Sequence, residues 1–353
     1  MEVPASTAHP LGAGRDRGFH PLRIMHVVQE TADTKSFALE VPPSLRDLFA
    51  YQAGQFCTFR VVIGDVEHLR CYSMSSAPEI DETMCVTVKR VPGGVVSNWM
   101  HDNLEPGDAI DTGVPTGRFC LGAGGRDVVA FGAGSGITPI LAIVKTALAT
   151  TARSVHLYYA NRDQGAVIFA DELDTLARKY PDRLAVRHHL DAEEGLVGGD
   201  DVRAWLGGRT GADYYVCGPG PFMDVVEGAL VEEGVDAADI RIERFTPTDA
   251  APGPGAGPPG GVGNPQVTIE LRGRGATAEH RPGTTIIQVA RELGMSPPSS
   301  CEAGSCATCM ARLVEGEVAM RTNNVLTPEE VAEGWILTCQ AVPTSSSVRI
   351  VYD

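Results

Sequence analysis

Hydrophobic and polar positions along this chain follow two different rhythms before a stretch dominated by Pro and Gly. From Leu22 to Cys120, short segments such as CVTVKRV, FALEVP and QFCTFRVV often alternate apolar and polar residues, and Gly or Pro turns separate them. Alternation with a period of two is typical of strands that are buried on one face. The pattern therefore predicts an antiparallel barrel or sandwich over residues 21–123.

From Asp127 onward, short apolar runs alternate with helical patterns. The strand-like runs are DVVAF, VHLYYA, LAVRHHL, DYYVC and DIRIERF. Between them lie ITPILAIVKTAL, FADELDTLARKY and PFMDVVEGALVEEG, whose apolar residues recur near i, i+3 and i+4. Repeated β-then-α units predict an α/β domain over residues 124–245, with a parallel sheet that helices cover on both faces.

The stretch TPTDAAPGPGAGPPGGVGN, residues 246–264, has almost no apolar side chains to bury. Pro and Gly dominate it, so a solvated linker is expected there. Residues 1–20 lack the basic-then-apolar pattern of a signal sequence and are predicted to be a flexible tail. A third folded module is expected over residues 265–353.

Composition narrows the possible functions. The chain has 353 residues, which is too long for one ordinary core, and its net charge of −16 argues against a nucleic-acid partner. No apolar run approaches the roughly 18 residues that a membrane span needs. The nine cysteines are an odd number, and five of them are scattered, which fits a cytoplasmic protein better than a secreted disulfide framework.

Four cysteines of the third module have the spacing of a metal site. CEAGSCATC places Cys301, Cys306 and Cys309 in a C-x4-C-x2-C pattern, and Cys339 follows in ILTCQ. This spacing is that of plant-type ferredoxins, which predicts a 2Fe-2S cluster. A structural zinc site is the alternative, although zinc sites usually show two paired knuckles. The strand-like QVTIELRG, MARLVEG and SVRIVYD and one helix, TIIQVARELG, would form a β-grasp module around the cluster loop.

A glycine-rich turn follows the first strand-like run of the α/β region. In FGAGSGITP, Gly132, Gly134 and Gly136 would let a pyrophosphate approach the backbone at the start of a helix, and Thr138 would add a hydroxyl. A plain strand–helix turn is the alternative. A second turn, CGPGPFM at Cys217–Met223, ends a later strand, and ligands of parallel sheets bind at such strand ends.

The residues alone do not decide whether the nucleotide is NADH or NADPH. Arg162 follows the second strand and could pair with a 2′-phosphate, whereas Asp163 would repel one or accept a hydrogen bond from a 2′-hydroxyl. Both residues could also be solvated loop charges.

Four short motifs in a fixed order resemble the ferredoxin–NADP reductase family throughout residues 21–245. They are Arg70-Cys71-Tyr72-Ser73, Gly93–Ser97, FGAGSGITP and CGPGPFM. The resemblance implies a flavin site in a β-barrel and a nicotinamide nucleotide site in the α/β domain. A pyrophosphate site at a helix start favours FAD over FMN.

The resemblance also implies roles for single residues. Tyr72 would stack on the isoalloxazine, Ser73 would form a hydrogen bond near its N5, and Cys217 would lie near the nicotinamide C4. The flavin phosphates would be bound by Arg70, Gly94, Ser97 and Lys89. Gly218 and Pro219 belong to the nucleotide motif, and Glu243 and Phe245 resemble the family's acidic residue and aromatic shield, although they could be plain strand-end residues.

The order flavin–nucleotide–ferredoxin resembles reductase components of bacterial oxygenases. RCYSMSSAP, YYANRD and VIFADEL are similar to the reductase of 3-ketosteroid 9α-hydroxylase, and the reductase subunit of phenylacetyl-CoA epoxidase has the same layout. The resemblance implies hydride transfer from NADH, with NADPH possible, to FAD, then single electrons through the cluster to a separate oxygenase. A Rieske-type steroid hydroxylase is the expected partner. A di-iron oxygenase, or a non-catalytic redox sensor or zinc module, is the alternative.

Overall fold

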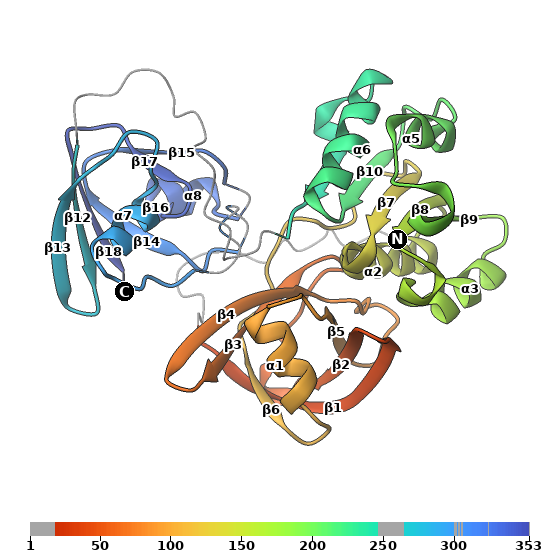
Figure 1. Ribbon diagram of the computed structural model, residues 1–353, viewed down its shortest axis with the longest axis horizontal. Coiled ribbons are helices and arrows are strands. Elements are labelled where there is room, and N and C mark those ends of the chain that lie inside the picture. Colours follow the sequence, from red (N-terminus) through yellow and green to blue (C-terminus); the bar gives the residue numbers. More distant parts are fainter. Residues whose placement is uncertain are drawn as a thin grey trace, which may run out of the picture.

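A computed structural model describes residues 18–245, 265–299, 302, 304, 306–323 and 325–352 of the chain. The predicted linker, 246–264, lies outside the described residues, as do residues 1–17 of the predicted tail. The described part forms three larger sheets of six, five and five strands and one two-stranded sheet. Figure 1 shows each larger sheet with its own helices.

The first sheet is antiparallel throughout, in the order β4-β3-β6-β1-β2-β5. A bridge between Met74 and Val86 connects the chain after β4 with β5, so the two edges of the sheet meet. The predicted antiparallel β-barrel is therefore confirmed. Its strands are β1 (His20–Thr31), β2 (Thr34–Glu40), β3 (Phe56–Ile63), β4 (Val66–Ser73), β5 (Met84–Lys89) and β6 (Ala109–Thr112).

The barrel core follows from the alternation in its strands. Phe37 on β2 and Phe59 on β3 are fully buried, and helix α1 (Val95–Asn103) adds Val96 and Met100 to the same apolar cluster. A short 3-10 helix, Pro43–Leu45, lies between β2 and β3.

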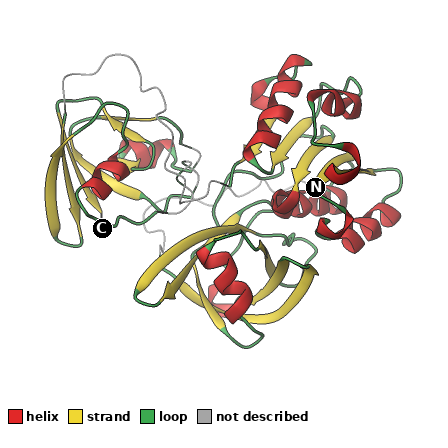
Figure 2. Ribbon diagram, in the orientation of Figure 1, coloured by secondary structure: helices red, strands yellow, loops and turns green. Residues whose placement is uncertain are grey.

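The second sheet is parallel, in the order β11-β10-β7-β8-β9. Its chain order reverses between β7 and β10, so the helices that follow these two strands cover opposite faces (Figure 2). The predicted α/β domain is confirmed. Its elements are β7 (Val128–Ala133), η2 (Gly134–Gly136), α2 (Ile137–Thr150), β8 (Val155–Asn161), η3 (Gln164–Ala166), α3 (Ala170–Lys179), β9 (Leu184–Leu190), α4 (Asp191–Glu194), α5 (Gly199–Leu206), β10 (Asp213–Cys217), α6 (Gly220–Glu232), η4 (Ala237–Asp239) and β11 (Ile240–Glu243).

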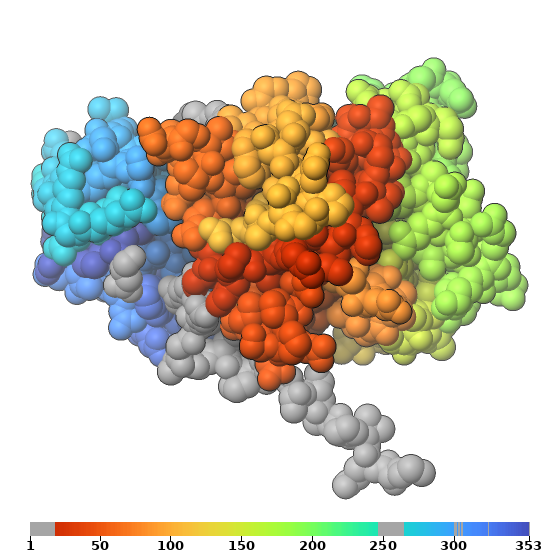
Figure 3. Space-filling model, turned by 90° about the horizontal axis from the view of Figure 1, so that it is seen from below, coloured from red at the N-terminus to blue at the C-terminus, as the bar shows by residue number. Residues whose placement is uncertain are grey.

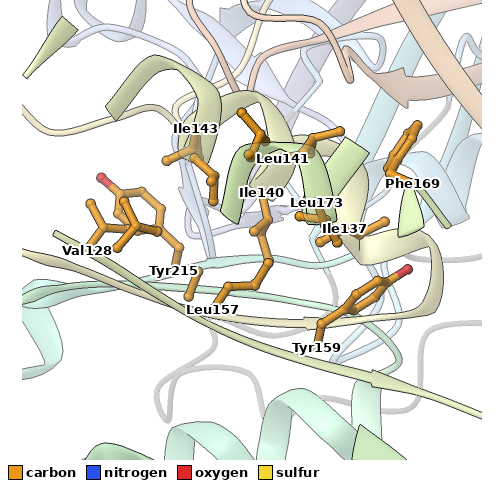
Figure 4. Packing of buried hydrophobic residues seen from close by; sticks show 14 of the residues in the cluster. Val128, Ile137, Ile140, Leu141, Ile143, Leu157, Tyr159, Phe169, Leu173 and Tyr215 are labelled. Carbon is orange, nitrogen blue, oxygen red and sulfur yellow. The ribbon is translucent and has the colours of Figure 1, made fainter. Parts of the chain in front are cut away.

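Helix α2 is buried over almost its whole length. Ile137, Ile140 and Leu141 lie in the apolar cluster against the sheet, near Val128 and Leu157 (Figure 4). A helix that is apolar all round must be covered on more than one side. The barrel supplies the second cover.

Two polar residues of α2 fasten the barrel to the second sheet. The Nζ of Lys145, whose side chain is 8% exposed, lies 2.7 Å from an Asp81 oxygen of the barrel and 2.6 Å from a Glu172 oxygen of α3. Thr146 donates a hydrogen bond of 2.8 Å to Glu79 of the same barrel turn. Burial alone would lower the pKa of Lys145, but the two carboxylates raise it, so its charge is kept at this junction.

The third sheet has the order β13-β12-β18-β14-β16, and only β12 and β18 pair in parallel. This mixed sheet with helix α7 across it is the predicted β-grasp module. The helix α8 was not predicted, because five residues are too few to show a period. The elements are β12 (Gln266–Leu271), β13 (Arg274–Glu279), α7 (Ile286–Glu292), β14 (Met310–Glu315), β15 (Val318–Met320), α8 (Pro328–Ala332), β16 (Trp335–Leu337), β17 (Ala341–Pro343) and β18 (Ser347–Tyr352).

The barrel lies between the other two parts, as the space-filling view shows (Figure 3). It makes two polar contacts with the third module. Arg118 Nη2 donates a 3.3 Å hydrogen bond to the backbone carbonyl of Leu326, and Arg272 lies 4.0 Å from Glu67. Among the described residues, no helix is both long and apolar enough to cross a membrane.

A buried carboxylate at the amino-terminal edge of the parallel sheet forms ion pairs with three arginines. Asp213 is 3% exposed, lies 2.5 Å from both Arg126 and Arg153, and lies 3.5 Å from Arg241. Burial alone would raise the pKa of Asp213, but the hydrogen bonds and charges of the arginines lower it. This network joins β10 to the chain around β7 and β8.

Asp213→Asn should destabilise the protein by about 3–5 kcal/mol, because the buried guanidinium of Arg153 would lose its counter-charge. The free energy of unfolding from urea titrations followed by circular dichroism would measure this change. Asp239→Asn removes the more exposed partner of Arg126 and is the matched control, with an expected cost of about 0–1 kcal/mol. Equal costs for the two substitutions would contradict this account of the network.

Candidate flavin, nucleotide and cluster sites

Three strand ends meet where the order of the parallel sheet reverses. Gly132 at the end of β7 pairs with Cys217 at the end of β10, and Cys217 pairs in turn with Glu243 at the end of β11. In open parallel sheets, ligands bind at such a reversal, beyond the carboxyl ends of the strands. Both predicted nucleotide turns therefore lie at one edge of the sheet.

The three positions of the first turn are occupied by glycine for different structural reasons. A Cβ on Gly136 would lie 2.2 Å from the carbonyl oxygen of Cys217, and one on Gly132 would lie 3.3 Å from the side chain of Ile140. Position 136 therefore needs glycine for packing, whereas a side chain at position 132 would require Ile140 to move by a few tenths of an ångström. Gly134 has a φ of +52°, and its Cβ direction is open except for the Lys89 Nζ at 4.0 Å. Only Gly134 combines a left-handed backbone with room for a ligand.

Hydrogen bonds within the turn hold its shape. Thr138 is 2% exposed and donates through its hydroxyl to the carbonyl of Ser135 at 3.0 Å, so this hydroxyl can offer a ligand only an acceptor. Tyr159 on β8 donates to the carbonyl of Gly134 at 3.2 Å. In the second turn, a Cβ on Gly218 would lie 2.9 Å from both Ala133 and Phe222, and Pro219 precedes α6.

The barrel brings its own predicted residues to the same edge along β4. Tyr72 is half-buried, with its ring centroid 5.8 Å from that of Phe59. The half-buried Arg70 donates to the backbone carbonyl of Leu69. Ser73 is the last residue of β4 and is 3% exposed.

Ser73 and Glu243 join the barrel to the parallel sheet. Ser73 Oγ donates a 3.2 Å hydrogen bond to Glu243 Oε2 across 170 positions of sequence. Burial raises the pKa of Glu243 to about 8, against a smaller lowering by the Ser73 hydrogen bond. At neutral pH this carboxyl is therefore protonated and can donate a hydrogen bond at the site.

The neighbouring Cys217 is fully buried, and burial raises the pKa of its thiol, with the nearby Glu243 acting in the same direction. A neutral thiol is a weak nucleophile, so Cys217 can shape the site but is not set up to attack a substrate. Phe245 follows β11 and is 43% exposed, so its ring is available to cover a ligand.

The predicted pyrophosphate residues lie at the start of α1. Gly94 is the residue before the helix, and a Cβ there would lie 2.7 Å from Ser97 Oγ. Ser97 is 5% exposed and accepts a hydrogen bond from the backbone N–H of Val91, while Asn98 donates to the carbonyl of Gly94 at 2.6 Å. The turn is thus held closed from within, which leaves the N–H groups at the start of α1 for an anion.

A cavity of about 460 Å³ opens beside this turn. Lys89, Arg90, Asn98 and Arg162 line it together with one carboxylate, Asp33. The Asp33 Oδ2 lies 3.7 Å from Lys89 Nζ and 3.5 Å from Arg162 Nη2. Sequence reasoning missed Asp33, because it lies in an ordinary strand turn of the barrel and meets Arg162 only in three dimensions.

Three of the four predicted cluster ligands belong to the described residues, and Cys301 lies outside them. Cys306, Cys309 and Cys339 are 6%, 3% and 5% exposed. The described residues contain no group of three or more His, Cys, Asp or Glu side chains placed as around one metal ion. Cys309 and Cys339 belong to one apolar cluster with Leu326 and Leu337.

Cys309 and Cys339 lie close together. A hydrogen bond between them raises the pKa of Cys309 and lowers that of Cys339. The backbone of Gly304 and the side-chain amide of Gln340, at 3.6 Å, also donate to the Cys339 sulfur. Donors aimed at a sulfur stabilise negative charge on it, so these residues fit a cluster of thiolate-bound iron.

The loop around these cysteines has an unusual backbone. Glu302, Gly304 and Ala307 have φ values of +50°, +75° and +56°. Arg291 on α7 forms an ion pair with Glu302, 2.5 Å apart, and Gln340 donates to the Glu302 carbonyl at 2.7 Å. Sequence reasoning missed Arg291 and Gln340, because their role depends on where α7 and the chain after β16 meet the loop.

The chain matches three domain families. An oxidoreductase FAD-binding domain matches residues 21–120, an oxidoreductase NAD-binding domain matches 131–228, and a 2Fe-2S iron-sulfur cluster binding domain matches 269–344. The ferredoxin reductase component of 3-ketosteroid-9-alpha-monooxygenase from Rhodococcus rhodochrous is 39% identical over 94% of this chain and 96% of its own length.

Two further relatives also match this chain over nearly its whole length and nearly the whole of their own. One subunit of the 1,2-phenylacetyl-CoA epoxidase of Escherichia coli is 32% identical over 95% of this chain and 98% of its own. The solved structure of phthalate dioxygenase reductase, a modular electron-transfer protein, has a TM-score of 0.60 and 25% identity over 95% of this chain and 98% of its own.

The chain belongs to the family of oxygenase reductase components that combine FAD-binding, NAD-binding and 2Fe-2S domains. It is an oxidoreductase that delivers electrons to an oxygenase component. The predicted fold class, cofactors and general function are thereby confirmed.

Gly304→Ala should lower the iron content per flavin to half or less. A Cβ there would lie 2.7 Å from the Thr322 carbonyl, in a backbone with positive φ. Iron analysis and the visible spectrum of the purified protein would show the loss. Gly294→Ala is the matched control, because Gly294 has a similar φ of +70° but no atom within 4 Å of its Cβ position. Equal iron contents in the two variants would refute the close fit of this loop.

Glu243→Gln should stabilise the protein increasingly as the pH rises. The folded state binds the Glu243 proton more tightly than the unfolded chain, so wild-type stability falls between about pH 4.5 and about pH 8. Glutamine stays neutral, and the variant's advantage should grow by up to about 1.4 kcal/mol per pH unit in that window. Unfolding midpoints at pH 5, 7 and 9 would measure it, with Glu233→Gln at an exposed position as the control. A difference that is constant with pH would be evidence against a protonated Glu243.

Proposed function

We propose that this oxygenase reductase accepts a hydride from NADH and delivers single electrons to a Rieske-type oxygenase that hydroxylates a steroid. FAD, when bound, supplies the change from two-electron to one-electron transfer, and the 2Fe-2S cluster supplies the one-electron exit. The protein's own residues bind and orient these groups and exclude water.

The observation that carries the proposal is that the barrel contacts both neighbouring modules beside their predicted functional residues. The Ser73–Glu243 hydrogen bond links the flavin-side strand β4 to the nucleotide-side strand β11. Arg118, at the other side, donates to the carbonyl of Leu326, whose side chain packs with Cys309 and Cys339. Direct contacts therefore connect the nucleotide domain to the barrel, and the barrel to the module that contains the cysteines.

The flavin-side assignments rest on position and chemistry. Tyr72 and Ser73 are the last two residues of β4, and they supply an aromatic ring and a hydroxyl at this end of the strand. Arg70 and Lys89 carry the positive charge that the flavin phosphates require. Gly94 and Ser97 form the turn whose helix N–H groups would hold the pyrophosphate.

The residues assigned to the nucleotide site lie along the edge of the sheet where β7, β10 and β11 end. Gly134 would admit the nucleotide phosphates to the backbone, and Thr138 and the turn of Gly218 and Pro219 would line the approach. Cys217 and Glu243 would lie beside the nicotinamide, with Glu243 protonated at neutral pH and Phe245 as a cover. Gly132 and Gly136 act through packing, which keeps the two turns in contact.

For the third module we assign Cys301, Cys306, Cys309 and Cys339 as the iron ligands. We assign the FAD domain to residues 21–123, the nucleotide domain to 124–245 and the ferredoxin domain to 265–353. The eight described cysteines form no disulfide with one another, which supports a reducing compartment such as the cytoplasm.

The partner assignment rests on the relatives. The 3-ketosteroid monooxygenase reductase is 39% identical to this chain, and the phenylacetyl-CoA epoxidase relative is 32% identical. A Rieske centre also has a higher reduction potential than a plant-type cluster, so electrons would pass to it downhill.

Anaerobic stopped-flow mixing would test the proposal on the holoenzyme. NADH should reduce the flavin first and the cluster second, and the reduced protein should then reoxidise faster with a purified Rieske-type ketosteroid oxygenase than with a di-iron epoxidase. Steroid hydroxylation should require all components. Faster transfer to the di-iron enzyme would overturn the partner assignment, and flavin reduction without cluster reduction would overturn the electron route.

A further inference from the structure

Asp33 of the barrel reaches across to the nucleotide domain. It lies between β1 and β2, and its two carboxylate oxygens have separate partners. Oδ1 accepts hydrogen bonds from the hydroxyls of Thr31 and Thr34 at 2.9 and 3.1 Å. Oδ2 lies 3.7 Å from Lys89 Nζ and 3.5 Å from Arg162 Nη2. One oxygen therefore fixes the turn and the other faces two cations.

The carboxylate keeps its charge in this position. Burial alone would raise the pKa of Asp33, but the Thr31 hydrogen bond, the Lys89 charge and then Thr34 and Arg162 lower it. The Arg162 side chain is 70% exposed, so without Asp33 its guanidinium would be free to bind an anion. Asp33 thus adds a negative charge beside an accessible arginine.

Arg162 has a position that matters for the nucleotide. It directly follows β8, the strand next to the glycine-rich turn on β7. In this type of sheet, the residues after the second strand meet the 2′ position of the adenosine ribose, where an arginine accommodates a 2′-phosphate. A 2′-phosphate paired with Arg162 would therefore lie close to the Asp33 carboxylate.

We propose that Asp33 is a specificity-determining residue, which neutralises Arg162 from the neighbouring domain and thereby favours NADH over NADPH. The proposal rests on the proposed function, because it concerns the nucleotide that the reductase oxidises. The 2′-hydroxyl of NADH is uncharged and meets no repulsion there. The 2′-phosphate of NADPH would have to compete with Asp33 for Arg162 and would be repelled by it.

Asp33→Asn is a sharp test, because asparagine keeps the oxygen that Thr31 and Thr34 bind and removes the charge. The ratio of kcat/KM for NADPH to kcat/KM for NADH, measured with ferricyanide on the holoenzyme, should rise roughly tenfold, as expected for one charge contact near a surface. In Asp33→Asn combined with Arg162→Gln the rise should disappear. Asp65→Asn, in the exposed turn between β3 and β4, is the charge-matched control and should leave the ratio unchanged.

The outcomes separate this inference from the proposed function. Wild-type protein that oxidises neither nucleotide would refute the reductase function itself. A wild type that uses NADH but whose ratio is unmoved by Asp33→Asn would overturn only the role of Asp33. The role of Asp33 would also be overturned if the ratio still rose in the variant that lacks Arg162. The same conclusion would follow if Asp163→Asn, and not Asp33→Asn, raised the ratio.

Discussion

The burial of helix α2 on two sides is the constraint on which the arrangement of this reductase depends. The helix begins at the nucleotide turn, so its position on the sheet determines where that turn lies. Its other side lies against the barrel, where Lys145 and Thr146 hold the turn that carries Asp81 and Glu79. Because one rigid element serves both domains, the barrel cannot shift without exposing apolar surface and separating charges. Because the two domains are held in this arrangement, Ser73 of the barrel lies opposite Glu243 of the parallel sheet.

Much of the architecture could be read from the sequence, because its signals are local. The strands LAVRHHL and DYYVC coincide with β9 and β10. DYYVC is the short, fully buried run expected of a central parallel strand, whereas β9 lies at the sheet edge and is only partly buried. Short helices were missed: α5 and α8 have eight and five residues, too few for a helical period to stand out. The cysteine spacing and the four ordered motifs identified the family because their chemistry requires nearly fixed distances along the chain.

What the sequence could not supply are the contacts between distant segments. Asp33 and Arg162, or Arg291 and Glu302, are ordinary charges until the fold brings them together. The glycines show the same limit. Gly132, Gly134 and Gly136 look equivalent in FGAGSGITP, yet a neighbouring strand end or helix explains two of them and an open approach explains only one. A side-chain pattern cannot reveal which backbone atoms will approach it.

The contact between Arg118 and Leu326 differs from the other contacts between modules described above in that its acceptor is a backbone carbonyl. Every residue type has such a carbonyl, so the contact does not depend on the side chain at position 326. The two apolar clusters of the third module consist of that module's own residues. In evolution, much of the surface of this module can therefore change to suit a new oxygenase while its contact with Arg118 is kept. A family built in this way can acquire new partners by changing one module without rebuilding the other two.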